Sequence, residues 1–203
     1  MKTEQRDFFA AKANDYDKEE SRTQNVDNIG QSMLKHVSFT KEMRIMDFGS
    51  GTGLLLTQIA PFVGEITAVD ISASMNGVLK SKVAAIGCPL QILEMDLTKE
   101  PLESKFDAII SSMTIHHIED VKALFKKFYS LLEDGGLIAI ADLDKEDGSF
   151  HTEDTGVFHL GFDRGEFLSI AADAGFRELE MHDASVMEKP AGNYPIFLLT
   201  GKK

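Results

Sequence analysis

The sequence has little of several features that mark other kinds of protein. Its 203 residues include one cysteine, Cys88, so no internal disulfide can form and we expect a reducing, cytoplasmic setting. Charged side chains interrupt the first fifteen residues, where a secretory signal needs an apolar core. The apolar runs stop well short of the roughly 18–20 residues of a membrane span. These absences predict a protein that is neither secreted nor membrane-bound.

Positive charge is also scarce. Lys and Arg number 21 against 33 Asp and Glu, which gives a formal charge of −12, and no long basic run interrupts this balance. Affinity for nucleic acid comes mainly from neutralising phosphates, so DNA and RNA are excluded as expected partners. The 43% of hydrophobic residues is enough for a sizeable core. With no internal repeat and no proline-rich linker, we expect residues 1–203 to form a single domain.

Short apolar runs alternate with longer segments of helical period, which is the pattern of an α/β domain. The pattern predicts a doubly wound, mainly parallel seven-stranded sheet with one antiparallel C-terminal strand. The expected strands are Arg44–Phe48, Glu65–Val69, Leu90–Met95, Phe106–Ser111, Leu137–Asp142, Glu178–Val186 and Tyr194–Leu199. The expected helices are Leu54–Phe62, Ala73–Ile86, Asp120–Leu132 and Arg164–Ala174. We expect residues 1–41 to form a helical cap, 42–142 the core, and 143–203 a substrate-side loop, the last helix and the final strands.

A glycine-rich turn follows the first expected strand. Gly49, Gly51 and Gly53 stand at alternate positions between a strand and a helix, where glycine allows a sharp turn and close approach of a ligand. The dinucleotide fingerprint needs a small residue at the sixth position, and Leu54 stands there. Asp47 lies just before the glycines, and its carboxylate favours a cationic ligand over a pyrophosphate.

The segment Asp47–Gly53 closely resembles the first motif of the class I S-adenosylmethionine-dependent methyltransferases. The entry segment Phe8–Asp17 is similar to that of the ubiquinone-biosynthesis-like branch, in which an N-terminal helix covers the cofactor. This resemblance implies a Rossmann-like methyltransferase fold, S-adenosyl-L-methionine as cofactor and S-adenosyl-L-homocysteine as product. It also places Tyr16 near the methionine end of the cofactor, where an aromatic face suits a sulfonium.

Later strand ends carry matching residues. Asp70 ends the second strand and is placed to accept both ribose hydroxyls, as an acid does in dinucleotide enzymes too. Asp96 resembles the family position that contacts adenine, although an acid there also suits a turn cap. The full set of expected cofactor-binding residues is Tyr16, Asp47, Gly49, Ser50, Gly51, Gly53, Asp70, Ile71, Met75, Asp96, Leu97, Ser112 and Met113.

The fourth expected strand leads into a segment that resembles the small-molecule branch of the family. Ser111-Ser112-Met113-Thr114 stands where enzymes that methylate nucleobases carry an N/D-P-P-Y/F run. Methylation of DNA bases and of glutamine is therefore disfavoured, and the resemblance implies a small-molecule acceptor.

The acceptor side has several candidate bases but no single strong one. Histidine is the usual base near neutral pH, and the expected catalytic residues are His116, His151, His159 and Asp142. For each histidine taken singly, a plain structural role is favoured over that of a base. The segment from Asp142 to Phe162 mixes acids, histidines and aromatics, which favours an active-site wall and leaves a metal site or a solvated loop as alternatives. We expect no metal.

The sequence thus predicts a methyltransferase that transfers a methyl group by in-line displacement to a small-molecule acceptor. Two other functions stay open: a nicotinamide-dependent oxidoreductase on a related fold, and a non-catalytic protein that binds the cofactor as a partner. The expected oligomeric state is a monomer or a homodimer.

Overall fold

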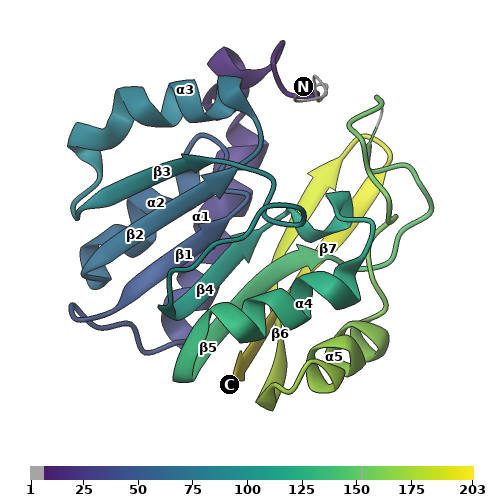
Figure 1. Cartoon of the computed structure of the whole chain (residues 1–203). Helices are drawn as coiled ribbons and strands as arrows, with labels where there is room; N and C mark the ends of the chain where they lie inside the picture. The colour runs from purple at the N-terminus through teal and green to yellow at the C-terminus, as the bar shows by residue number, and fades with distance from the viewer. Residues whose placement is uncertain (1–6, 152) are drawn as a thin grey trace.

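The computed structural model describes residues 7–151 and 153–203 and shows a seven-stranded sheet of order β3-β2-β1-β4-β5-β7-β6 (Figure 1). β7 runs antiparallel to both of its neighbours, and the pairs among β1 to β5 are parallel, as expected. The strands are β1 Arg44–Phe48, β2 Glu65–Asp70, β3 Leu90–Glu94, β4 Phe106–Ser112, β5 Leu132–Leu143, β6 Arg177–Lys189 and β7 Gly192–Lys202.

Helices cover both faces of the sheet, so the doubly wound prediction is confirmed. Figure 1 shows α4 and α5 in front of the sheet and α1 and α2 behind it. The α-helices are α1 Glu20–His36, α2 Leu54–Ile59, α3 Ala73–Lys82, α4 Val121–Leu131 and α5 Arg164–Asp173. Short 3-10 helices are η1 Ala13–Lys18, η2 Ala60–Phe62, η3 Val83–Ala85 and η4 Ile115–His117. The residues expected to form an N-terminal cap therefore fold as η1 and α1 from residue 13 onward.

Side-chain caps fix where three of the helices begin. Ser72 accepts a hydrogen bond from the N–H of Met75 at the start of α3, and Asp120 accepts one from Ala123 at the start of α4. Asp163 does the same at the start of α5. Each such cap satisfies an N–H that the helix cannot and contributes about 1 kcal/mol.

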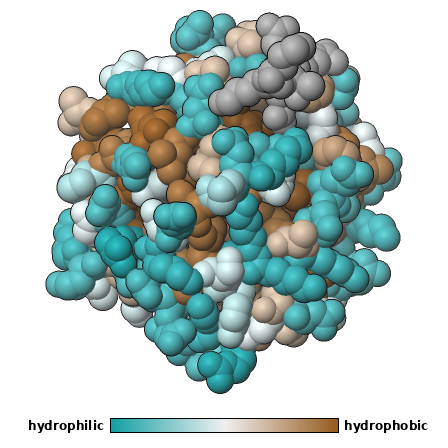
Figure 2. All heavy atoms as spheres, viewed as in Figure 1, coloured by the Kyte–Doolittle hydropathy of each residue, from teal (hydrophilic) through white to brown (hydrophobic). Residues whose placement is uncertain are grey.

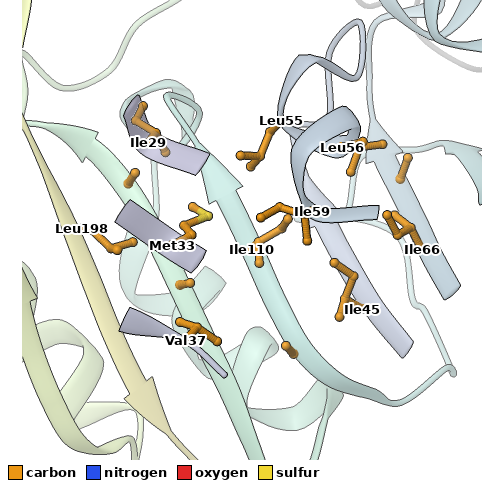
Figure 3. Close-up of a cluster of buried hydrophobic side chains, with 14 of the residues drawn as sticks. Ile29, Met33, Val37, Ile45, Leu55, Leu56, Ile59, Ile66, Ile110 and Leu198 are labelled. Carbon is orange, nitrogen blue, oxygen red and sulfur yellow. The ribbon is translucent and has the colours of Figure 1, made fainter. Parts of the chain in front are cut away.

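The core has two layers, one on each face of the sheet. On one face, α1 and α2 bury apolar side chains against the strands. Figure 3 shows Met33, Ile59 and Ile110 pointing into one cluster, and all three are fully buried. On the other face, Phe125 and Phe128 of α4 are fully buried. Burying a side chain of this size contributes about 1.5–3 kcal/mol each, so these faces hold the helices on the sheet.

The fifth strand begins earlier than the sequence predicts. β5 starts at Leu132, directly after α4, whereas the prediction placed its start at Leu137 beyond two helix-stopping glycines. The register with β4 shifts between the pairs that Phe106 and Ala108 make, and Gly135 has a φ of 79° inside this irregularity. The glycines therefore form a bulge within the strand rather than a loop before it.

The surface in Figure 2 is mostly hydrophilic, with hydrophobic residues gathered in the upper left of the view, on the side of the sheet that carries β2 and β3 in Figure 1. Among residues 7–151 and 153–203, no helix is long and apolar enough to cross a bilayer.

The carboxyl ends of β1, β2, β4 and β5 meet at one edge of the sheet. Chain order reverses between β1 and β4, so the loops that follow these two strands diverge and leave a crevice between them. The long connection between β5 and α5 has no regular secondary structure in its described residues and passes over the same edge. The expected site residues lie at this edge.

Candidate active site

A cavity of about 290 Å³ lies at the carboxyl edge of the sheet. Its lining comes from stretches that are far apart in the chain, namely residues 9–26, 47–55, 112–117, 150–151, 153–155 and 187–189. The glycine turn and the loop after β4 form one side, and the cap residues, the loop after β5 and the end of β6 close the other. Such an enclosed, mixed polar and apolar space suits a small-molecule ligand.

The glycine turn keeps its backbone open towards this cavity. Gly49 and Gly51 have φ values of 73° and 53°, in the left-handed region that other residues avoid. A Cβ on Gly49 would lie 2.2 Å from the side chain of Thr114, so packing alone requires glycine there. A Cβ on Gly51 would meet nothing within 4 Å among the described residues. The bare backbone of Gly51 thus faces open space that a ligand can fill.

Asp47 is a buried carboxyl group without a balancing charge. It is 1% exposed, and its Oδ2 has no hydrogen-bond partner within the described part of the chain. Burial raises the pKa of Asp47 to about 8, and the neighbouring charge of Asp70 adds to the effect. The hydroxyls of Ser50 and Ser112, also in the lining, are buried without partners in the same described residues. This set of unsatisfied polar atoms fits a polar ligand that brings positive charge to Asp47.

Asp70 holds the glycine turn from the end of β2. Its Oδ2 accepts the N–H of Gly51 at 2.8 Å, and its Oδ1 accepts the N–H of Ser72 at 2.8 Å. Burial raises the pKa of Asp70, although these two N–H groups oppose the shift. A carboxylate oxygen has room for a further donor, so hydroxyl groups of a ligand can still bind there. The residue lies beside the cavity and does not line it.

The N-terminal cap closes over the ends of β1 and β2. The carboxylate of Asp7 accepts hydrogen bonds from the hydroxyls of Ser72 and Ser74, the latter at 2.7 Å. Asp17 accepts one from Thr52 Oγ1 at 2.5 Å and pairs with Lys82. The cap is therefore attached to the glycine turn and to the start of α3 by polar contacts.

The structure brings only part of the predicted cofactor set to the cavity. The residues that line it are Tyr16, Asp47, Gly49, Ser50, Gly51, Ser112 and Met113. Those that lie outside its lining are Gly53, Asp70, Ile71, Met75, Asp96 and Leu97. Asp96 pairs with Lys99 at 2.7 Å and accepts the hydroxyl of Thr98, so it also acts as a turn cap. Ile71, the residue after Asp70, remains 53% exposed.

Two of the candidate catalytic residues form a buried pair. Asp142, at the end of β5, lies with Oδ1 2.6 Å from Nδ1 of His116, and the two residues are 0% and 1% exposed. Burial opposes ionisation of Asp142, but the charge and hydrogen bond of His116 and the N–H groups of Leu143 and His116 outweigh it, so the pKa of Asp142 lies below its usual value. An ionised Asp142 accepts a hydrogen bond from Nδ1–H of His116, so Nε2 is the ring nitrogen that can take up or release a proton.

His151 and His117 join this pair. The ring of His151 lies 5.2 Å from that of His116 between centroids, and its Nε2 is buried with no partner among the residues described. Burial, with the nearby charge of His116, lowers the pKa of His151 to about 3 and that of His117 to about 4. Both are therefore neutral at pH 7. In the described ranges, no group of three or more His, Cys, Asp or Glu is arranged to hold a metal ion.

His159, also expected as a candidate base, lies outside the lining of this cavity, unlike His116 and His151. It does not line the cavity, and its Nε2 lies 2.9 Å from the carbonyl oxygen of Ile118. The N–H groups of Phe158 and His159 both donate to the carbonyl of His116, at 3.0 and 3.1 Å. Through these contacts, the loop after β5 is attached to η4 and to the residue that follows it.

Sequence reasoning missed three cationic residues of the lining, Lys12, Arg22 and Lys189. Lys12 lies in the entry segment Phe8–Asp17, where attention fell on the aromatic residues. Arg22 and Lys189 lie in segments of ordinary surface composition, and the packing of α1 against β6 brings them together. No local pattern in the sequence distinguishes them from the other Lys and Arg residues.

Comparison with known proteins gives a consistent family. The model of a methyltransferase domain matches residues 30–168. An uncharacterised methyltransferase of Schizosaccharomyces pombe is 30% identical over 74% of this chain and 57% of its own length. A ubiquinone biosynthesis O-methyltransferase of Xanthomonas axonopodis is 25% identical over 71% of this chain and 62% of its own. The chain spans about half the length of the first curated relatives it matches.

A solved structure repeats the whole architecture. The putative methyltransferase of Haloferax volcanii, solved in complex with a Trm112 methyltransferase activator, superposes with a TM-score of 0.78 at 16% identity and covers 98% of both chains. At this identity the likeness concerns the fold. The family model covers more than half of the chain, so this protein belongs to the methyltransferase domain family, as the glycine turn after β1 predicts.

Proposed function

We propose that this protein is an S-adenosylmethionine-dependent methyltransferase that acts on a small-molecule acceptor. The observation that carries the proposal is Asp47, a buried carboxyl group whose Oδ2 has no partner among the described residues and which lies in the lining of a cavity beside a glycine turn. A pyrophosphate would keep this carboxyl group in its protonated form, whereas a ligand with a sulfonium and an ammonium group would stabilise the carboxylate. The dinucleotide alternative is the less favoured one for this reason.

The residues of the glycine turn would hold the donor. Asp47 and the backbone of Gly51 line the cavity on the side of the donor. The two carboxylate oxygens of Asp70 have further lone pairs that suit ribose hydroxyls. Ile71, exposed next to Asp70, offers an apolar surface for an aromatic base. When bound, the donor supplies a methyl carbon activated by a positively charged sulfur. The protein's own contribution is to orient the acceptor and to exclude water.

The His116–Asp142 pair would remove a proton from the acceptor. Asp142 accepts the hydrogen bond of Nδ1–H, so in the neutral imidazole the free ring nitrogen is Nε2, and His116 lines the cavity. A base of this kind contributes about 10²- to 10⁴-fold where the nucleophile must lose a proton. We therefore favour an acceptor that carries a hydroxyl or a protonated amine.

The family comparison supports a small acceptor. The relative from Xanthomonas is named as an O-methyltransferase of ubiquinone biosynthesis, which favours the ubiquinone-like branch for this chain too. The domain arrangement expected from the sequence, one domain with a cap, a core and a substrate-side segment, fits this division of the cavity.

Calorimetric titration with S-adenosylhomocysteine tests the proposal. We expect micromolar binding, and Asp70→Ala should weaken it by about 1.5–3 kcal/mol, the usual strength of hydrogen bonds to a charged group. No binding near millimolar ligand would overturn the proposal. Binding without turnover over a broad acceptor panel, followed by mass spectrometry, would instead favour a non-catalytic partner protein.

A further inference from the structure

Three cationic side chains reach the same cavity from three separate elements. Lys12 precedes η1, Arg22 lies in α1, and Lys189 is the last residue of β6. The same lining holds the carboxyl groups of Asp47, Glu19 and Glu153, so it matters which of the cations lacks a partner. Like charges repel, and their convergence needs a compensating group.

Two of these cations have carboxylate partners. Lys12 pairs with Glu153 at 2.6 Å. Arg22 pairs with Glu19 at 2.6 Å, and its guanidinium carbon lies 3.9 Å from the centroid of the Tyr16 ring. Their charges are balanced within the protein.

Lys189 has no such partner. Its Nζ donates to the carbonyl oxygen of Phe150 at 2.7 Å and lies 3.6 Å from the centroid of the Phe150 ring. Within residues 7–151 and 153–203, no carboxylate lies within 4.0 Å of it. Burial lowers the pKa of Lys189. The more distant carboxylates of Glu19 and Glu146 oppose this shift, and the positive charges of Arg22 and Lys12 add to it. An ammonium has three donors, so two remain for a ligand.

The cavity lining also carries polar atoms that are buried without a partner in the described residues. They include Oδ1 of Asn25, a residue that is 3% exposed, and Nε2 of His151. Thr155 Oγ1 lies 3.1 Å from Nδ1 of His151, and when this hydroxyl donates, Nε2 carries the ring proton. His151 is then a neutral donor towards the ligand, beside the charge of Lys189.

We propose that the acceptor carries an oxyanion, a carboxylate or a phosphate, and that Lys189 binds it. The inference rests on the proposed function, because it concerns the acceptor half of the same cavity. The glycine turn follows β1, whereas Lys189 ends β6, beyond β4, β5 and β7 in the sheet. The oxyanion therefore lies at the end of the cavity opposite Asp47, with the His116–Asp142 pair between the two ends.

A purely structural role for Lys189 is the alternative. In that case its contacts with Phe150 only fasten the loop after β5 to the β6–β7 hairpin. Lys189→Met separates the two roles, because methionine keeps an apolar stem over the Phe150 ring and removes the charge. Lys122→Met is the matched control, since Lys122 is an exposed residue of α4 that does not line the cavity.

The test titrates sodium phosphate and sodium acetate into the protein at constant ionic strength, with and without saturating S-adenosylhomocysteine, and follows binding by NMR shifts of cavity residues. We expect millimolar dissociation for at least one anion, at least about fivefold weaker binding in Lys189→Met, and no change in Lys122→Met. Preference for phosphate or for acetate identifies which oxyanion the acceptor carries.

The inference is overturned when neither anion binds below about 50 mM, or when Lys189→Met binds as the wild type does. Failure of the proposed function is a different result, namely no binding of S-adenosylhomocysteine by the wild type. Lys189→Met should bind that ligand within about twofold of the wild type, which also checks that the variant is folded. Lys189→Gln takes its place should the methionine variant unfold.

Discussion

The protonation of Asp47 gives a sharp test of the donor site. Its pKa is raised to about 8, so at pH 7 the carboxyl group is mostly protonated in the free protein. A positively charged ligand favours the carboxylate, and binding should therefore release close to one proton below pH 8. S-adenosylhomocysteine has no sulfonium, so the positive charge that it brings is the ammonium of its amino-acid group, which stays protonated over this pH range.

The magnitude follows from linkage. Below the pKa of the free protein, the dissociation constant should fall about tenfold for each rise of one pH unit, since one unit corresponds to 1.36 kcal/mol. Between about pH 5.5 and 7.5 the affinity should rise about 100-fold, or about 2.7 kcal/mol. Calorimetry in two buffers with different ionisation enthalpies measures the released proton directly.

Asp47→Asn is the matched variant, because it keeps the shape of the side chain and removes the titration. Its affinity should lose this pH dependence, and any slope that remains reports on Asp70, whose pKa is also raised. Equal slopes for variant and wild type would refute the reasoning. The free energy of unfolding changes with pH in the opposite direction to the affinity. Because the carboxyl pKa is raised in the folded protein, stability falls as pH rises from about 4 towards 8. Asp47→Asn should therefore stabilise the free protein by up to about 4 kcal/mol at pH 7.

Three further predictions concern single residues. Gly51→Ala should lower the free energy of unfolding in urea by about 1 kcal/mol, because a φ of 53° disfavours alanine. The added Cβ would occupy the space that the ligand needs, so S-adenosylhomocysteine should bind at least about tenfold more weakly in calorimetry. Unchanged affinity would contradict the assignment of that space to the ligand. Asp142→Asn should lower kcat about 10²- to 10⁴-fold by fixing the wrong tautomer of His116, with affinity for the donor retained, and an unchanged kcat would exclude the base. The pKa of His117 is about 4 in the folded protein and about 6.5 in the unfolded chain, so the unfolded chain binds more protons. The free energy of unfolding should therefore fall by about 1.5 kcal/mol from pH 6.5 to 5. His117→Gln should remove that loss in urea titrations.

The sheet and the donor end of the site could be predicted because their signals are local. Short, nearly continuous apolar runs mark the strands, and Gly49 and Gly51 stand where backbone geometry favours glycine. The start of β5 could not be predicted, because Gly135 and Gly136 signal a helix stop and a strand bulge equally well. Only pairing with β4 decides between them.

The acceptor end depends on long-range packing. Both His151 and His159 stand beside phenylalanines in one irregular segment, and no local feature separates them. Long-range contacts separate them in the structure. The carbonyl oxygens of His116 and Ile118 hold the backbone and the ring of His159 outside the cavity lining. Lys189 enters the cavity because β6 packs against α1, where Asn28 Nδ2 donates to Ser185 Oγ at 3.3 Å.

The order of the sheet explains why the two ends of the cavity differ in charge. The crevice between β1 and β4 is fixed by Ser111, whose hydroxyl donates to the carbonyl of Phe48 at 2.7 Å, so the donor end is set by the sheet itself. The acceptor end is built from the cap, the loop after β5 and the end of β6, which are joined mainly by side-chain contacts such as that of Lys189 with Phe150. Substitutions there can change the acceptor without disturbing the glycine turn. The chemistry of Lys189 is therefore the feature of this chain on which acceptor choice depends, whereas Asp47 serves any acceptor.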